Sequence, residues 1–220
     1  MEERASGIIL RTRTFTETSL IVQWITADLG RIATVAKGAR RPKSPFLGKL
    51  DLFYEADFSF QRSRRSELHA LREVQLTKTH AELRRDLAWV HQASYFGVLI
   101  ELGTEAETPI REVYELFAAV LKAIPLTKPR ARTVLSFELK LLRLLGYDPD
   151  FSALNSEGEA LAKSLLESSF EELSGLTAAS GSHREVNRFV QIAVGTALDR
   201  LPPQREKAME ALLPRTTGSS

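Results

Sequence analysis

The sequence of 220 residues contains no cysteine. This absence excludes disulfides, thiolate nucleophiles, cysteine-type zinc fingers and iron–sulfur clusters. Glycine and proline are sparse, at 12 and 9 residues, while 43% of the residues are hydrophobic and 26% are charged. Such a composition excludes disordered, collagen-like and low-complexity proteins and is typical of a globular chain.

Long hydrophobic runs are missing as well. No apolar stretch approaches the roughly 18 residues of a membrane span. The first residues have neither the basic flank nor the apolar centre of a signal peptide. We therefore expect no membrane partner and a cytoplasmic location.

Catalytic motifs are also absent. The chain has no phosphate loop, nucleophile elbow, zinc-protease pair or dinucleotide glycine fingerprint. The histidines do not indicate a metal site, because the spacing from His80 to His91 corresponds to about 16.5 Å along a helix. We therefore expect a protein that is not an enzyme and binds no metal or cofactor.

Positive charge is concentrated near the N-terminus. The net charge is only +2, but residues 1–80 hold 14 basic and 9 acidic side chains. Two clusters stand out, one at residues 37–43 and one at residues 62–65. An uneven distribution of this kind indicates an anionic partner.

The first third of the chain has the patterns of short strands. Five runs rich in β-branched and aromatic residues are separated by turn residues. They are Gly7–Phe15, Ser19–Thr26, Arg31–Lys37, Asp51–Gln61 and Glu67–Val74. Five strands in about 70 residues suit a small barrel of the OB type, a fold that often binds single-stranded nucleic acid.

Beyond this region the hydrophobic residues recur with the period of a helix. The predicted helices are Ala81–Leu102, Glu107–Ile124, Pro129–Leu145, Ser156–Leu173 and His183–Leu201. The third is apolar on nearly every side and should be the buried central helix. We expect an α+β multidomain fold, with an OB-fold nucleic-acid-binding domain at 1–78, an all-α helical domain at 79–213 and a disordered tail at 214–220.

A DNA-binding surface is expected on the barrel, because the loop after the third strand projects four cations from a rigid sheet. A solvated charged turn is the alternative for this loop, and solubility alone could explain the three arginines at residues 62–65. Arginines on strands would extend the surface, since alternate strand residues share a face. The candidate DNA-binding residues are Lys37, Arg40, Arg41, Lys43, Arg11, Arg13, Arg31, Arg62, Arg64 and Arg65.

Aromatic rings could stack on bases of a single strand. Those available in the barrel are Trp24, Phe53, Tyr54, Phe58 and Phe60. We expect most of them in the core, with Tyr54 the most exposed.

On the central helix, Arg132, Lys140 and Arg143 would share a basic edge beside leucines. This edge could hold an acidic peptide with an aromatic end. An ordinary solvated edge of a buried helix is the alternative.

Two stretches carry a resemblance to a known family. One contains Glu17–Leu20, Thr26–Gly30 and Val35–Ser44, and the other contains Phe137–Leu142 and Leu145–Tyr147 followed by Pro149. In order and spacing the chain resembles the RecO family of recombination mediators over roughly residues 5–200.

The resemblance implies a DNA repair protein that binds single- and double-stranded DNA and anneals complementary strands. It also implies two protein partners, RecR and the acidic C-terminal tail of single-stranded DNA-binding protein (SSB). With them the protein would help to load RecA onto SSB-coated DNA. A place at the bacterial nucleoid would follow.

The chain departs from the family pattern at two places. The cysteine zinc module of many members is missing, because Asp150–Leu154 leads almost directly into Ser156–Leu161. The basic stretch near the C-terminus is reduced to Pro202–Arg205. Two rival interpretations therefore stay open: an adaptor that binds proteins and no DNA, and a hydrolase whose site would need a pocket of perturbed acids.

Overall fold

The computed structural model describes residues 2–128 and 130–210. The chain divides into two compact units. One contains the residues up to Ala81 together with Ile100–Leu121, and the other contains Glu82–Leu99 together with the residues from Lys122 onward. A domain boundary near residue 78 stays a prediction.

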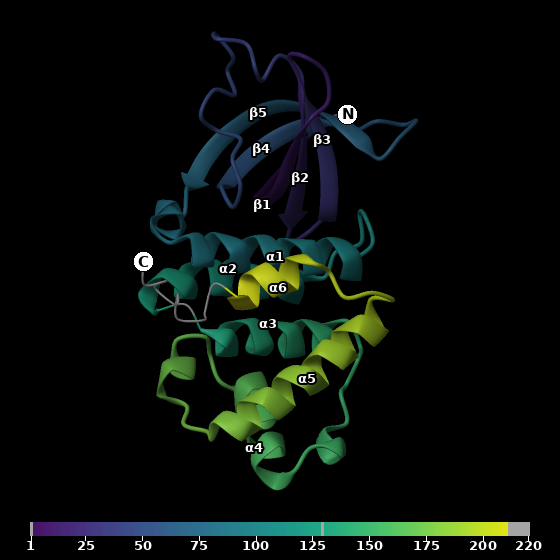
Figure 1. Ribbon diagram of the computed structural model, residues 1–220. Coiled ribbons are helices and arrows are strands. Elements are labelled where there is room, and N and C mark those ends of the chain that lie inside the picture. The colour runs from purple at the N-terminus through teal and green to yellow at the C-terminus, as the bar shows by residue number, and fades with distance from the viewer. Residues whose placement is uncertain (1, 129, 211–220) are drawn as a thin grey trace. The chain divides into compact units, whose positions relative to one another are not determined.

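Five strands close into a barrel in the first unit (Figure 1). They are β1 (Glu2–Thr14), β2 (Leu20–Thr26), β3 (Gly30–Ala36), β4 (Glu55–Gln61) and β5 (Leu68–Lys78). The order around the barrel is β1-β2-β3-β5-β4, and every neighbouring pair is antiparallel except β3 and β5. The predicted five-stranded OB-fold barrel is confirmed.

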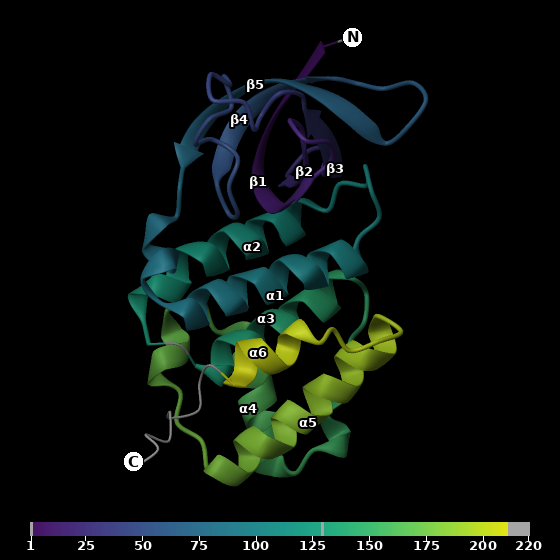
Figure 2. The ribbon, with the colours of Figure 1, turned by 45° about the horizontal axis from the view of Figure 1, so that its top comes forward.

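Alternation along the strands sends one set of side chains into the barrel. Ile9, Val22 and Trp24 are all fully buried in its core. The Trp24 ring stacks on Phe58 with centroids 4.1 Å apart, and its Nε1 donates a hydrogen bond of 2.9 Å to Thr34 Oγ1. Figure 2 shows the strands curving around this filled interior.

Two strands are longer than the sequence indicates. Glu2–Ala5 lack the alternation of a strand, yet they pair with Phe58–Gln61 of β4. At the far end of β5, Lys78 pairs with Glu55. Backbone pairing with a neighbour, more than intrinsic propensity, therefore sets these strand ends.

The turn between β2 and β3 ends at Gly30, where only glycine fits. Its φ is +67°, and a Cβ at this position would lie 2.3 Å from the carbonyl oxygen of Thr108. Beside it, Glu107 N–H donates a 2.8 Å hydrogen bond to Arg31 O. The segment 104–110 therefore lies directly against the start of β3.

Six α-helices follow the barrel strands in the described residues. They are α1 (Leu87–Gly103), α2 (Arg111–Ala123), α3 (Ala131–Leu144), α4 (Ser156–Glu167), α5 (Ser180–Ala197) and α6 (Gln204–Glu210), with 3-10 turns at 81–85, 124–126, 151–153 and 172–175. The first predicted helix starts late, because Asp86 caps α1 by accepting from Ala88 N–H at 2.8 Å. Helix α6 was not predicted, since its seven residues are too few to show a helical period.

Helix α3 forms the centre of the second unit. Its residues Thr133–Leu139 are buried without a break, which confirms the predicted buried central helix. Helices α4, α5 and α6 all contact it. Phe137 of α3 stacks on Phe96 of α1 with centroids 4.1 Å apart.

The carboxylate of Glu138 lies inside this core at 1% exposure. Arg205 of α6 pairs with it through two hydrogen bonds, Nε to Oε1 at 2.7 Å and Nη2 to Oε2 at 3.0 Å. Tyr95 donates to the same carboxylate at 2.5 Å, and Asn187 accepts from Arg205 at 2.9 Å. The buried carboxylate is thus fully hydrogen-bonded, as burial of a charge requires.

The connection from α3 to α4 is short. It contains the 3-10 turn Phe151–Ala153, capped by Asp150, which accepts from Ser152 N–H at 2.9 Å. This connection is where the resemblance places the missing zinc module. The predicted disordered tail at 214–220 lies outside the described residues.

Candidate nucleic-acid interface

The basic loop, residues 37–49, leaves β3 and folds into successive tight turns. Arg41 N–H donates to Gly38 O and Ser44 N–H donates to Arg41 O, both at 3.0 Å. Two apolar side chains anchor the loop to the barrel core, Ala39 at 7% and Phe46 at 6% exposure. The cations of this loop therefore project from an ordered base, as predicted from the sequence.

The basic loop holds five cations, of which Lys49 is half-buried; the four predicted ones are exposed, but they differ in their contacts. Arg40 joins the loop to the β1–β2 turn, because its N–H donates to Thr18 O at 3.0 Å and its Nη1 donates to Glu17 O at 2.9 Å. Within the described residues, no side-chain hydrogen bond or ion pair is found for the other three, Lys37, Arg41 and Lys43. Their charges are available to an external anion.

The strand arginines are more engaged. Arg11 pairs with Glu101 at 3.1 Å, a carboxyl whose pKa is raised by burial and held back by the charge of Arg11. Arg31 donates to Thr104 through Nε at 3.3 Å and through Nη2, to the carbonyl oxygen, at 2.9 Å. Arg13 is exposed, and its charge, like those of Arg11 and Arg31, acts to lower the pKa of Glu101.

The cluster at residues 62–65 is divided by the fold. Arg62 forms an ion pair with Glu3 at 2.6 Å and a second pair with Glu107. The hydrogen bond from Arg62 holds the pKa of Glu3 below its usual range. Arg64 and Arg65 stay exposed in the turn between β4 and β5. Only these two side chains of the cluster remain accessible, since Arg62 is committed to the barrel.

Most candidate stacking rings lie in the core, as predicted. Trp24, Phe53, Phe58 and Phe60 are all 0–3% exposed. Tyr54 is half-buried, whereas Phe15 is 53% exposed at the end of β1. The sequence pattern places Phe15 only as the last residue of a strand. The polar run Thr16–Thr18 that follows it indicates a turn, and a ring next to a turn is more often exposed.

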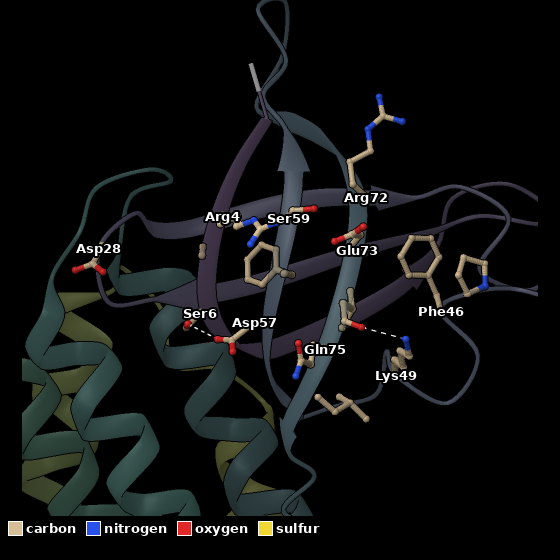
Figure 3. Close-up of a pocket in the computed structure, with 15 residues that line it drawn as sticks. Arg4, Ser6, Asp28, Phe46, Lys49, Asp57, Ser59, Arg72, Glu73 and Gln75 are labelled. Carbon is tan, nitrogen blue, oxygen red and sulfur yellow. Dashed lines mark hydrogen bonds between the residues drawn. The ribbon is translucent and has the colours of Figure 1, made fainter.

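A hollow of about 890 Å³ crosses the outer face of β1, β4 and β5 (Figure 3). Its charged side chains are balanced in number: Arg4, Lys49 and Arg72 are basic, and Asp28, Asp57 and Glu73 are acidic. Ser6 donates to Asp57 at 2.5 Å, and Lys49 donates to Val74 O at 3.1 Å. Mixed charge of this kind does not favour a polyanion.

Burial raises the pKa of Glu101, and this carboxyl is paired with Arg11. No group of three metal-ligating side chains is found in residues 2–128 and 130–210.

Each of the three cations predicted on α3 contacts the chain that follows the helix. Arg132 Nε lies 2.9 Å from His183 Nε2, and Arg143 pairs with Glu167 at 2.7 Å. Lys140 donates to Leu166 O at 2.6 Å and lies over the Phe170 ring, 5.9 Å from its centroid. Burial lowers the pKa of Lys140, and the neighbouring charge of Arg143 adds to this.

Two family descriptions match the chain, Recombination protein O N terminal over residues 1–80 and Recombination protein O C terminal over residues 84–205. The chain belongs to the RecO family. A relative named DNA repair protein RecO from Rhodopirellula baltica is 34% identical over 96% of this chain and 77% of its own length. Relatives of the same name are 28% identical in Anaeromyxobacter sp. strain K, over 95% and 88% of the two chains, and 30% identical in Syntrophus aciditrophicus, over 66% and 56%.

The RecO resemblance predicted from the two sequence stretches is therefore confirmed. None of the helices within residues 2–128 and 130–210 has the length and apolar character that a membrane crossing requires. The basic loop of this RecO-family chain combines three features of an anion-binding surface: exposure, unpaired cations and an anchored backbone.

Proposed function

We propose that this RecO-family protein acts in DNA repair by holding single- and double-stranded DNA on its basic loop and bringing complementary strands together. The observation that supports it best is the set of three exposed cations, Lys37, Arg41 and Lys43, without partners among the described residues. A loop fixed by Ala39 and Phe46 need not be ordered on binding, so little conformational entropy is lost.

Annealing on this surface is electrostatic and needs no covalent chemistry. Lysine and arginine contact phosphates without reading sequence, which suits a protein that accepts any strand. Two strands bound near the same cations repel each other less, and their local concentration rises. Pairing then follows from base complementarity.

The proposed function also involves protein partners. We infer that RecR and the C-terminal tail of SSB bind this chain and that the complex helps to load RecA at a gap, within the bacterial nucleoid. The edge of α3 supports a peptide site, because Lys140 lies over the ring of Phe170 and Arg143 is an exposed cation paired with Glu167. The exposed Arg143–Glu167 pair could exchange its carboxylate for that of an acidic peptide at small cost.

The test is fluorescence anisotropy with a labelled single strand of about 30 nucleotides, titrated at several salt concentrations. The variant is Lys37→Ala, Arg41→Ala and Lys43→Ala together, with Arg40 kept because it supports the loop. Loss of three phosphate contacts should make log K fall less steeply with log salt, reducing the magnitude of the slope by about 2. Strand annealing should weaken as well. A matched control, Arg184→Ala with Arg188→Ala and Lys207→Ala, removes the same charge from exposed positions on α5 and α6.

Equal loss in both variants would show only a general charge effect and would contradict a site on the basic loop. Unchanged binding and annealing in the loop variant would contradict it as well. If the wild-type chain binds no DNA even at low salt, the adaptor interpretation replaces this proposal. Thermal stability of both variants should stay close to that of the wild type, because exposed side chains contribute little to folding.

A further inference from the structure

We infer that Phe15 stacks on a base of single-stranded nucleic acid, so that the loop end of the barrel takes unpaired nucleotides in preference to duplex. The inference deepens the proposed function and rests on it. It concerns the form of nucleic acid that the basic loop selects, and it assigns a role to an exposed ring that the fold does not use.

The first observation is the exposure of Phe15. In the described residues of the barrel unit, every other aromatic ring is buried or half-buried, whereas Phe15 is 53% exposed. The barrel core is already filled by Trp24, Phe58 and Phe60. Phe15 therefore contributes little to packing, and its ring presents an accessible face.

The second observation is the position of Phe15 beside the cations. Its N–H donates to Ser19 O at 3.0 Å, which closes the β1–β2 turn. The same turn accepts both hydrogen bonds of Arg40 through Glu17 O and Thr18 O. Figure 1 shows this turn and the loop after β3 at the same end of the barrel. A strand whose phosphates meet the basic loop would thus have its bases near the ring.

The third observation is that much of the strand surface is closed to a ligand. OB folds commonly bind oligonucleotides on the face of their second and third strands and on adjoining loops. Here the outward residues Ile21 and Ile25 of β2 are only 3% and 2% exposed. Arg31 of β3 is held by Thr104. The loops at the end of the barrel, where Phe15 lies, remain open.

Stacking discriminates between single and double strands. In a duplex, both faces of each base are covered by its neighbours, so an inserted ring would have to unstack the helix at a free-energy cost. In a single strand a base face is accessible at little cost, and every base has one. A ring beside unpaired cations therefore favours single strands without favouring a sequence.

The experiment compares Phe15→Ala, Phe15→Leu and Phe15→Trp with the wild type. Binding is measured on a single strand of about 30 nucleotides and on a duplex of the same length, at several salt concentrations. Loss of one stacking contact should weaken single-strand binding about 5- to 150-fold in the Ala variant. The Leu variant should lose nearly as much, because it keeps apolar volume but has no ring. Duplex affinity should change less than about two-fold, and the salt slope should not change, since the ring contacts no phosphate.

The Trp variant should keep wild-type affinity and provide a second readout. Its new indole is exposed, whereas of the two native indoles Trp24 is fully buried and Trp89 is half-buried, so the added signal is read as a difference from the wild type. Stacking should quench the added fluorescence when the single strand binds, and duplex should quench it much less. Thermal denaturation of all three variants should match the wild type, because Phe15 is largely exposed.

Wild-type affinity in the Ala or Leu variant would overturn the inference. Equal losses on single strand and duplex would overturn it too. Unchanged DNA binding together with a lost protein partner would make Phe15 a protein contact instead. If the ring variants behave normally while the loop variant loses binding, the proposed function stands and this inference alone fails. If neither affects binding, both fail.

Discussion

Removal of Arg205 should destabilise the second unit strongly. Arg205 is 5% exposed and makes two hydrogen bonds to the buried carboxylate of Glu138. In Arg205→Ala, Glu138 would keep Tyr95 as a donor but lose its cation. Breaking one side of a buried ion pair costs about 3–5 kcal/mol, because the remaining charge is left without compensation.

This loss of free energy of unfolding corresponds to a lower melting temperature. For a chain of this size, 1 kcal/mol corresponds to about 2–4 °C, so we expect a loss of about 6–20 °C in the transition of this unit. Helix α6 has only seven residues and cannot persist without its contacts to α3. Hydrogen exchange should therefore show early loss of protection at residues 204–210, and circular dichroism should report the thermal transition.

A second substitution tests the cause. Glu138→Gln in the Arg205→Ala background removes the unpaired charge and keeps a polar group for Tyr95. The double variant should be more stable than Arg205→Ala alone. A loss below about 1 kcal/mol in the single variant would refute the reasoning. A double variant no more stable than the single one would show that lost packing, and not an uncompensated charge, explains the effect.

Two further predictions concern the barrel unit. Gly30→Ala should lower the melting temperature of this unit measurably, because the new Cβ would meet the Thr108 carbonyl oxygen at a φ of +67°; an unchanged melting temperature would contradict the close approach. Glu3→Gln should reduce stability at pH 7, and the deficit should shrink as the pH is lowered toward about 3. The pKa of Glu3 is lowered in the folded chain by its hydrogen bond from Arg62, so its stabilisation is present above the ordinary pKa and is lost as the pH falls. Melting curves across this pH range check the sign, and a deficit that is constant with pH would refute it.

The barrel could be predicted from sequence because its signal is local. Val22 and Trp24 alternate with outward residues along β2, and that period fixes which side chains face the core. The buried character of α3 was equally readable, since apolar residues surround it on nearly every side. In both cases neighbouring residues carry the whole pattern.

The partners of the charged residues could not be predicted in this way. Arg31 and Arg62 looked like surface cations, yet Thr104 and Glu107, which hold them, lie about 40 residues or more further along the chain. Likewise, the sequence does not show that Arg205 is the counter-charge of Glu138. Such pairs depend on tertiary proximity. The sequence therefore indicates a group of cations at the candidate site, but it does not show which of them are paired within the chain and which can bind an external anion.

The interrupted chain path of the barrel unit has a consequence for synthesis. The strands end at Lys78, but Ile100–Leu121 belong to the same unit and supply the partners of Arg11, Arg31 and Arg62. A nascent chain that has just released β5 from the ribosome therefore still lacks Glu101, Thr104 and Glu107. The N-terminal unit must wait for part of the helical sequence before it can finish folding, although strands usually fold as soon as their domain has emerged.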